Sequence, residues 1–299
     1  MTLDIASQRT LGPLGEVGPL AFGQWRFVGH DTATATRLVE AALDAGMNLI
    51  DTADVYGLDW GGTAFGQAEQ LLGDVIAASP RIRDRMVLAT KGGITPPVPY
   101  DSSPSHLTGA LENSLRRLRT DRIDLYQIHR HDMYTHPADV AATLDGFIES
   151  GKVRAVGVSN HTPAQVEALL AHLRHPLVSN QPQYSVSHLS AQRDGTLDQC
   201  MRLGLVPLAW SPLGGGGVVT GDGIRTELLV ALDRLVAREG VDRASIALAF
   251  VLSHPSKPVA IVGSQNPERL MASTAALAVS LDRRDVYELI QASEGEALP

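Results

Sequence analysis

Eight short apolar segments, rich in valine, isoleucine and leucine, recur along this 299-residue chain and alternate with helical segments. Most of them lack polar alternation, which is typical of strands buried on both faces of a parallel sheet. At about 37 residues per strand–helix unit, they predict an α/β fold, the (β/α)8 TIM barrel. The expected strands are Leu20–Phe22, Met47–Ile50, Met86–Ala89, Ile123–Ile128, Val153–Val158, Pro176–Ser179, Val206–Ala209 and Val259–Val262.

The competing layout is a doubly wound sheet with a separate second domain. No Gly-x-Gly-x-x-Gly follows the first expected strand, and no Pro/Ser-rich linker divides the chain. We therefore expect one barrel domain over residues 1–299. A β-hairpin across Leu11–Gly18 should precede the barrel, and an extra helix near Asp282–Ala292 should follow it. Two helical segments separate the last two strands, and the one at Ser245–Ser253 is the candidate seventh barrel helix.

Composition excludes several classes of partner. With 33 acidic and 25 basic residues the net charge is −8, and this field repels nucleic acid and anionic membranes. A lone Cys200 excludes an intrachain disulfide and a multi-cysteine metal site. The polar start gives no sign of a signal peptide, and no apolar run reaches the ~18 residues that a membrane span needs. We therefore expect a cytoplasmic protein. Nothing in the sequence indicates an oligomeric state.

Polar or aromatic residues stand at seven consecutive expected strand ends, where a (β/α)8 barrel carries its chemistry. Each one alone has an ordinary structural explanation, such as a helix cap, a solvated charge or core packing. Their joint occurrence favours an active site. The residues are Asp51 with nearby Tyr56, then Lys91, His129, Ser159–Asn160, Asn180–Gln181, Trp210–Ser211 and Gly263–Ser264.

Four of these residues make a chemically coherent set. A free tyrosine has a pKa of ~10, and a nearby lysine should lower the pKa of Tyr56. Asp51 would hold Lys91 charged, and His129 would orient a substrate carbonyl. Tyr56 would then donate a proton to the carbonyl oxygen as hydride arrives. No side chain supplies hydride, so a cofactor must.

Seven sequence strings together resemble the aldo-keto reductases, in that family's order and over almost the whole chain. The similarity is greatest to a bacterial branch with a short C-terminal tail. The strings are Asp51-Thr-Ala-Asp-Val-Tyr56-Gly, Thr90-Lys91-Gly, Gln-Ile-His129-Arg, Gly157-Val-Ser159-Asn160, Asn180-Gln181, Trp210-Ser-Pro-Leu-Gly and Ile261-Val-Gly-Ser-Gln-Asn-Pro-Glu-Arg269.

The resemblance implies a catalytic tetrad of Asp51, Tyr56, Lys91 and His129, with Tyr56 as the proton donor. It also implies an extended nicotinamide dinucleotide bound without a Rossmann fold. Its carboxamide would be held by Ser159, Asn160 and Gln181. Its nicotinamide ring would stack on Trp210, and its pyrophosphate would be held by Ser211, Leu213 and Gly214.

Two segments have phosphate-binding features of their own. The run Gly214–Gly217 lets a phosphate approach the backbone, although a flexible loop without a ligand would also explain it. Asn266 can cap a helix whose N-terminus attracts anions. Gly263, Ser264 and Arg269 surround that terminus and can hold an adenosine 2′-phosphate. NADPH is therefore expected. NADH stays possible, because Gly263, Ala272 and Ser273 replace residues that many relatives use there.

The predicted activity is NAD(P)H-dependent reduction of a small aldehyde or ketone to an alcohol. Trp25, Trp60 and Tyr134 are candidate pocket walls, although core packing explains Trp25 and a surface loop explains the other two equally well. Arg130, His131 and Asp132 can bind a polar or charged substrate end, although an ion pair within the loop explains them equally well. One alternative is a metal-dependent hydrolase with zinc on His129 and His131. Another is a cofactor-binding sensor with little turnover. We expect no metal in the site.

Overall fold

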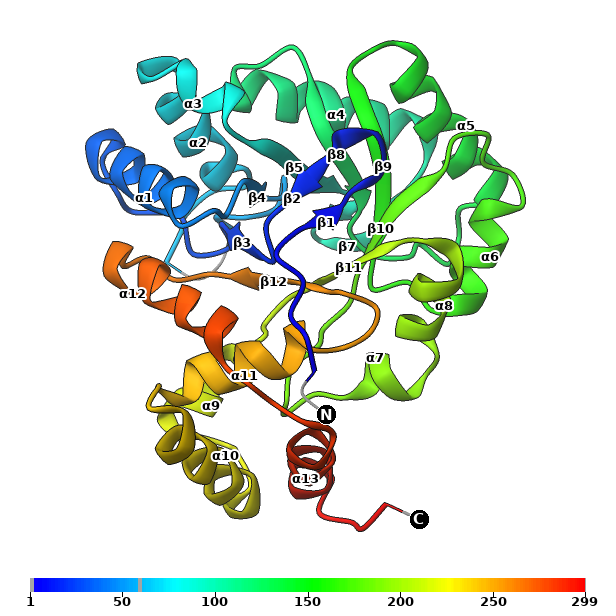
Figure 1. Ribbon diagram of the computed structural model, residues 1–299. Coiled ribbons are helices and arrows are strands. Elements are labelled where there is room, and N and C mark those ends of the chain that lie inside the picture. Colours follow the sequence, from blue (N-terminus) through cyan, green and yellow to red (C-terminus); the bar gives the residue numbers. More distant parts are fainter. Residues whose placement is uncertain (1–2, 59–60, 299) are drawn as a thin grey trace.

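Eight parallel strands form a closed barrel in the computed structural model, which describes residues 3–58 and 61–298 (Figure 1). This confirms the predicted (β/α)8 fold. Each strand pairs with the next one along the chain, and the last pairs with the first. The strands are β3 (Leu20–Gly23), β4 (Leu49–Asp51), β5 (Val87–Gly92), β8 (Ile123–Ile128), β9 (Val153–Ser159), β10 (Leu177–Gln181), β11 (Val206–Ala209) and β12 (Val259–Val262).

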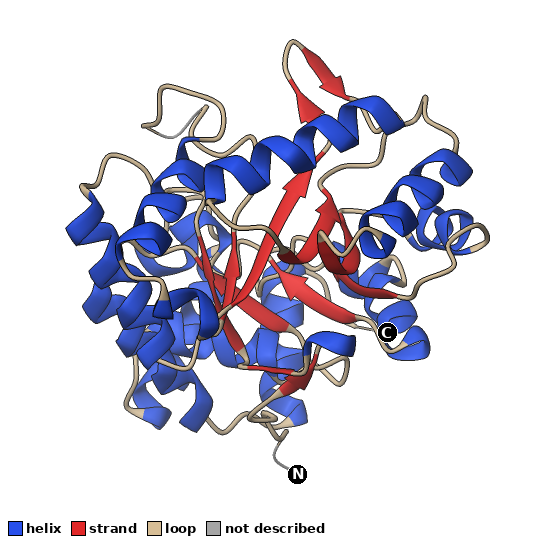
Figure 2. Cartoon of the chain, turned by 90° about the horizontal axis from the view of Figure 1, so that it is seen from above, coloured by secondary structure: helices blue, strands red, loops and turns tan. Residues whose placement is uncertain are grey.

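Helices surround the strands, as the view in Figure 2 shows. The longer ones are α1 (Thr32–Asp44), α2 (Gln67–Ala78), α4 (Pro104–Leu118), α5 (Pro137–Glu149), α6 (Pro163–Leu170), α8 (Thr196–Leu203), α10 (Thr226–Glu239), α11 (Arg243–Leu252), α12 (Pro267–Ala272) and α13 (Arg283–Glu294). The remaining helical segments are α3 (Arg81–Asp84), α7 (Ser190–Arg193), α9 (Gly217–Thr220), η1 (Gly12–Leu14), η2 (Gly214–Gly216) and η3 (Ser273–Ala278).

Local sequence signals fix several helix ends. The hydroxyl of Ser103 accepts a hydrogen bond from the backbone N–H of His106, with Pro104 in the first helical position of α4. The C-terminus of α1 lies just before Gly46, which has φ 79°. Between the last two barrel strands, α11 is buried from Ser245 to Leu252 and is the helix that packs against the barrel.

The predicted hairpin closes the amino-terminal end of the barrel. It consists of β1 (Arg9–Thr10) and β2 (Glu16–Val17), which pair antiparallel around η1. Leu11, Leu14 and Val17 pack into the same apolar cluster as the inward-facing strand residues. One further hairpin, β6 (Ile94–Thr95) with β7 (Val98–Tyr100), follows β5 and was not predicted, because its strands are too short to show periodicity.

The interior of the barrel is apolar toward the amino-terminal ends of the strands and polar toward their carboxyl ends. Leu49 and Ala89 belong to the inner apolar cluster. Side chains two residues apart on a strand share a face, so Asp51 and Lys91 also point into the barrel, one step nearer its carboxyl end. The strands therefore present the polar residues on top of a tightly packed apolar layer.

Truncation within this apolar layer should destabilise the whole barrel. Leu125 is fully buried in the inner cluster. We expect Leu125→Ala to lower the free energy of unfolding by about 2–5 kcal/mol, because it leaves a cavity in a packed core. Val230→Ala on the surface of α10, where the side chain is 64% exposed, is the matched control. Equal denaturant midpoints for the two variants would contradict this account of the core.

Candidate active site

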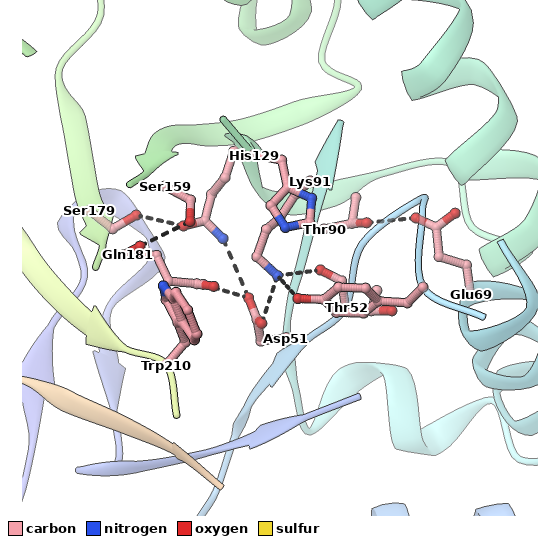
Figure 3. A network of polar contacts seen from close by, with 12 residues as sticks. Asp51, Thr52, Glu69, Thr90, Lys91, His129, Ser159, Ser179, Gln181 and Trp210 are labelled. Carbon is pink, nitrogen blue, oxygen red and sulfur yellow. Dashed lines mark hydrogen bonds and ion pairs between the residues drawn. The ribbon is translucent and has the colours of Figure 1, made fainter. Parts of the chain in front are cut away.

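Three of the four tetrad side chains are joined by hydrogen bonds at the carboxyl end of the barrel, and the fourth lies beside them. The ammonium of Lys91 donates to Asp51 Oδ2 at 2.7 Å and to Tyr56 Oη at 3.1 Å. Its third hydrogen bond goes to the backbone oxygen of Thr52 at 2.8 Å (Figure 3). The ring of His129 lies edge-on to that of Tyr56, with centroids 5.7 Å apart. The structure thus brings together all four residues that the sequence suggested.

Burial and charge act against each other at Lys91 and Tyr56. Burial is the largest single influence on Lys91 and disfavours its charged form, but Asp51 and Tyr56 together outweigh burial, and the pKa of Lys91 is raised. Burial raises the pKa of Tyr56, because it disfavours the charged phenolate. Lys91 lowers this pKa, but by less than burial raises it. Lys91 thus lowers the pKa of Tyr56 as expected, but the pKa is raised overall, because the effect of burial, which was not expected, is larger. The phenol is protonated at neutral pH, as a proton donor must be.

His129 is held in its neutral form. Burial is the main cause of a pKa well below the usual range, and the positive charges of Lys91 and Arg130 add to the effect. Its Nδ1 is buried without a hydrogen-bond partner among the described residues. A neutral imidazole in this position can donate one hydrogen bond to an uncharged ligand oxygen.

The residues expected to hold a carboxamide form a chain of hydrogen bonds that ends at the tetrad. Trp210 Nε1 donates to Asn160 Oδ1 at 2.9 Å, and Asn160 Nδ2 donates to Ser159 Oγ at 2.8 Å. The Ser159 hydroxyl donates to the backbone oxygen of Gln181 at 2.9 Å. The side chain of Gln181 then donates through Nε2 to Asp51 Oδ1, also at 2.9 Å (Figure 3).

The loop after β11 exposes its backbone beside this chain. Ser211 and Gly214 have φ values of 49° and 59°, and Gly214 packs so tightly that a Cβ would lie 2.5 Å from Ser187 Oγ. At Gly215 a Cβ would meet no atom within 4 Å, so its backbone is open to approach. The carbonyl of Gly215 also accepts a hydrogen bond from Arg26 at 3.5 Å, which connects the loops after β11 and β3. Leu213 is half-buried and packs on the main core.

The segment after β12 has the predicted cap. The side chain of Asn266 accepts from the backbone N–H of Arg269, and Pro267 begins α12. The hydroxyl of Ser264 accepts from the backbone N–H of Asn266. Gly263 and Arg269 are exposed, and Arg269 makes no ion pair within the part of the chain that the structure describes.

The three proposed pocket walls differ in their surroundings. Trp25 is half-buried at the carboxyl end of β3, and the Arg26 guanidinium lies 5.9 Å from its ring centre. Tyr134, in the loop after β8, is 96% exposed and does not lie against the tetrad. Trp60 lies outside the described residues. A cavity of about 320 Å³ adjoins the amide residues and is lined in part by Arg130, Asn160, His161, Gln183, His188 and Trp210.

Two buried glutamines in the site were missed by the sequence reasoning. Gln127, on β8, donates to Asp51 Oδ1 at 3.4 Å, and its only sequence signal is a polar residue inside an apolar strand. Gln24, directly after β3, is fully buried, and neither of its amide atoms has a hydrogen-bond partner in the described chain. Its position at the end of a strand is the sequence signal that could have identified it.

Two further properties concern the described residues alone. They contain no group of three or more histidine, cysteine or acidic side chains arranged to hold a metal ion. None of their helices combines the length and the apolar character that crossing a bilayer requires.

Comparison with known proteins agrees with the fold and the site. The model of the Aldo/keto reductase family matches residues 19–294. The chain therefore belongs to the aldo/keto reductase family of oxidoreductases. It is 48% identical over 295 residues to a protein named 6-dehydroglucose reductase from Novosphingobium aromaticivorans, with 97% of each chain covered. It is 35% identical to a protein of the same name from Agrobacterium fabrum, with 94% of this chain and 96% of the relative covered.

Solved structures of this family have the same architecture. A thermostable aldo-keto reductase bound to the inhibitor epalrestat superposes with a TM-score of 0.83 at 25% identity, covering 95% of this chain and 99% of the other. An aldo/keto reductase from Klebsiella pneumoniae, in complex with NADP and acetate, superposes with a TM-score of 0.77 at 27% identity. That match covers 99% of this chain and 97% of the other.

The buried His161 predicts how stability depends on pH. Burial lowers the pKa of His161 to about 4, against 6.5 when it is free. The unfolded chain therefore takes up a proton between pH 6.5 and 4 that the folded chain does not, so stability falls as pH falls through this window. His161→Gln should remove up to about 3 kcal/mol of that fall.

Urea unfolding at pH 7 and at pH 4 measures the effect. The matched control is His172→Gln, because His172 is exposed, and this variant should retain the wild-type pH dependence. An identical pH dependence in His161→Gln and the wild type would contradict the prediction.

Proposed function

We propose that this protein reduces the carbonyl of a small aldehyde or ketone to an alcohol with NADPH, and that Asp51, Tyr56, Lys91 and His129 carry out the proton chemistry. The observation that carries the proposal is the buried hydrogen-bonded series Asp51–Lys91–Tyr56, which ends in a protonated phenol beside a neutral imidazole. This arrangement suits proton transfer to a bound oxygen, because the donor is protonated and a cation stands beside it.

The surrounding residues fit a nicotinamide dinucleotide. Ser159, Asn160 and Gln181 offer amide and hydroxyl groups next to the half-buried ring of Trp210. The open backbone at Gly215, together with Ser211, Leu213 and Gly214, suits a pyrophosphate. Gly263, Ser264 and Arg269 would hold the 2′-phosphate. When bound, this cofactor supplies the hydride that reduces the carbonyl carbon.

Each tetrad residue then has one task. Tyr56 Oη gives its proton to the carbonyl oxygen, and Lys91 stabilises the phenolate that remains, since its ammonium is 3.1 Å away. Asp51 keeps Lys91 charged and fixed at 2.7 Å. His129 donates a hydrogen bond that orients the carbonyl oxygen, a task that its neutral form allows.

We infer a polyhydroxylated aldehyde as the substrate class. The two relatives named 6-dehydroglucose reductase support it, because that name describes a hexose oxidised at carbon 6. The alternative of a cofactor sensor predicts binding of NADPH with negligible turnover of any carbonyl.

Replacing the proposed proton donor tests the mechanism. We expect Tyr56→Phe to lower kcat for 6-dehydroglucose by at least about 100-fold, because general-acid catalysis is lost. The Kd for NADPH should change by less than about 2-fold, since the phenol does not belong to the cofactor residues. Steady-state turnover and fluorescence titration measure the two quantities. Unchanged turnover in the variant would refute the role of Tyr56, and no wild-type turnover across a panel of aldehydes would favour the sensor.

Removing Arg269 tests the preference for NADPH. We expect Arg269→Ala to weaken NADPH binding about 3- to 10-fold and to leave NADH binding unchanged, because only NADPH carries the 2′-phosphate. Arg284→Ala, which removes the same charge from the exposed surface of α13, is the control and should affect neither cofactor. Equal losses for NADPH and NADH in Arg269→Ala would contradict the proposed contact.

A further inference from the structure

We propose that Glu69 is a positioning residue for the proton donor. Through Thr90 and Arg117 it attaches the first turn of α2 to β5, and this attachment sets the separation between Tyr56 Oη and the ammonium of Lys91. Glu69 lies outside the tetrad and acts on it through other residues. The proposal rests on the proposed function, in which Tyr56 donates the proton.

Tyr56 depends on a helix for its place more than the other tetrad residues do. Asp51 and Lys91 belong to barrel strands and His129 directly follows one, whereas Tyr56 lies in the turn at residues 54–57, beyond the end of β4. Its backbone oxygen accepts a hydrogen bond at 3.2 Å from the N–H of Ala68, in the first turn of α2. The start of α2 therefore helps to place the phenol.

Glu69 follows Ala68 on α2 and is fully buried against β5. Its Oε1 accepts a hydrogen bond from the hydroxyl of Thr90 at 2.6 Å (Figure 3). Thr90 directly precedes Lys91, and successive side chains of a strand point to opposite faces. The strand β5 thus holds the ammonium on its inner face and, through Thr90 and Glu69, the start of α2 on its outer face.

Arg117, on α4, holds Glu69 from the other side. Its Nε donates to Glu69 Oε2 at 2.7 Å, and the two side chains are only 18% and 0% exposed. The same side chain packs under Gly66, directly before α2, where a Cβ would lie 2.5 Å from Arg117 Cδ and Nε. Its guanidinium also lies 5.8 Å from the ring centre of Phe65. Because water screens a buried pair little, the carboxylate has a fixed place between β5 and α4.

The contact that depends on this attachment is the longest of the three hydrogen bonds of Lys91. Those to Asp51 and Thr52, at 2.7 and 2.8 Å, stay within the end of β4, whereas the one to Tyr56, at 3.1 Å, reaches the turn that leads into α2. A shift of α2 away from β5 would therefore lengthen the contact with Tyr56 first. The attraction between ammonium and phenolate falls with distance, so proton transfer from Tyr56 would become slower.

Two kinds of variant detach α2 from β5. Thr90→Val removes the hydroxyl and keeps the shape of the side chain, whereas Thr90→Ser keeps the hydroxyl. The double variant Glu69→Met/Arg117→Met removes the carboxylate and should stay folded, because apolar side chains of similar volume replace both partners of the ion pair and leave no charge unpaired. The matched control is Asp145→Asn, which alters a buried carboxylate on α5 that binds Arg174, before the amino-terminal end of β10.

We expect Thr90→Val and the double variant to lower kcat for 6-dehydroglucose about 10-fold, while KM and the Kd for NADPH change by less than about 2-fold, because only the transition state depends on the contact. Thr90→Ser and Asp145→Asn should stay within about 2-fold of the wild type in all three quantities. Steady-state kinetics and fluorescence titration measure them, and urea unfolding shows that each variant is folded.

The outcomes separate this role from the proposed function. Absence of wild-type turnover across a panel of aldehydes would overturn the proposed function and this role with it. If the wild type is active, a wild-type kcat in folded Thr90→Val and in the folded double variant would overturn the positioning role and leave the function intact. An equal loss of kcat in Thr90→Ser or in Asp145→Asn would do the same, because the loss would then follow from destabilisation alone.

Discussion

The buried ion pair of Lys91 and Asp51 is the interaction on which the proposed active site depends. An isolated ammonium inside a barrel would be strongly unfavourable, because water is lost without replacement. Here the three N–H bonds of Lys91 meet three oxygens, those of Asp51, Thr52 and Tyr56. The charge is retained, and its field is directed at the phenol that is proposed to release a proton.

The same carboxylate connects the tetrad to the amide residues. Asp51 Oδ2 accepts from Lys91, while Oδ1 accepts from Gln181 and, at longer distance, from Gln127. Through Gln181 the series continues to Ser159, Asn160 and Trp210. Five barrel strands, together with the residue that follows β11, thus contribute to one polar layer. The apolar layer beneath it, which the N-terminal hairpin closes at the far end, gives these side chains a rigid base.

Much of this arrangement could be predicted from the sequence. Seven of the eight apolar segments contain most of an observed strand, and Met86–Ala89 contains half of β5, because burial on both faces leaves a continuous apolar run. The residues at the strand ends followed directly from the fold, since parallel strands bring their carboxyl ends to one face. The short β6–β7 hairpin and the exposure of Tyr134 were not predicted, because no periodicity or motif accompanies them. Gln127 stands in one of the sequence strings, but its contact with Asp51 depends on how the strands pair and was not predicted either.

The sequence by itself determined the barrel, its order of strands and the identity of the groups at its mouth, because these depend on local patterns of apolar and polar residues. Only the tertiary structure decided how those groups act. The pKa of Tyr56 is raised although Lys91 is adjacent, because burial outweighs one neighbouring charge. The amide of Asn160 has one orientation because it accepts from the indole of Trp210 and donates to Ser159 and to the backbone oxygen of His129. Both outcomes depend on distances and burial, and these exist only once the barrel has closed.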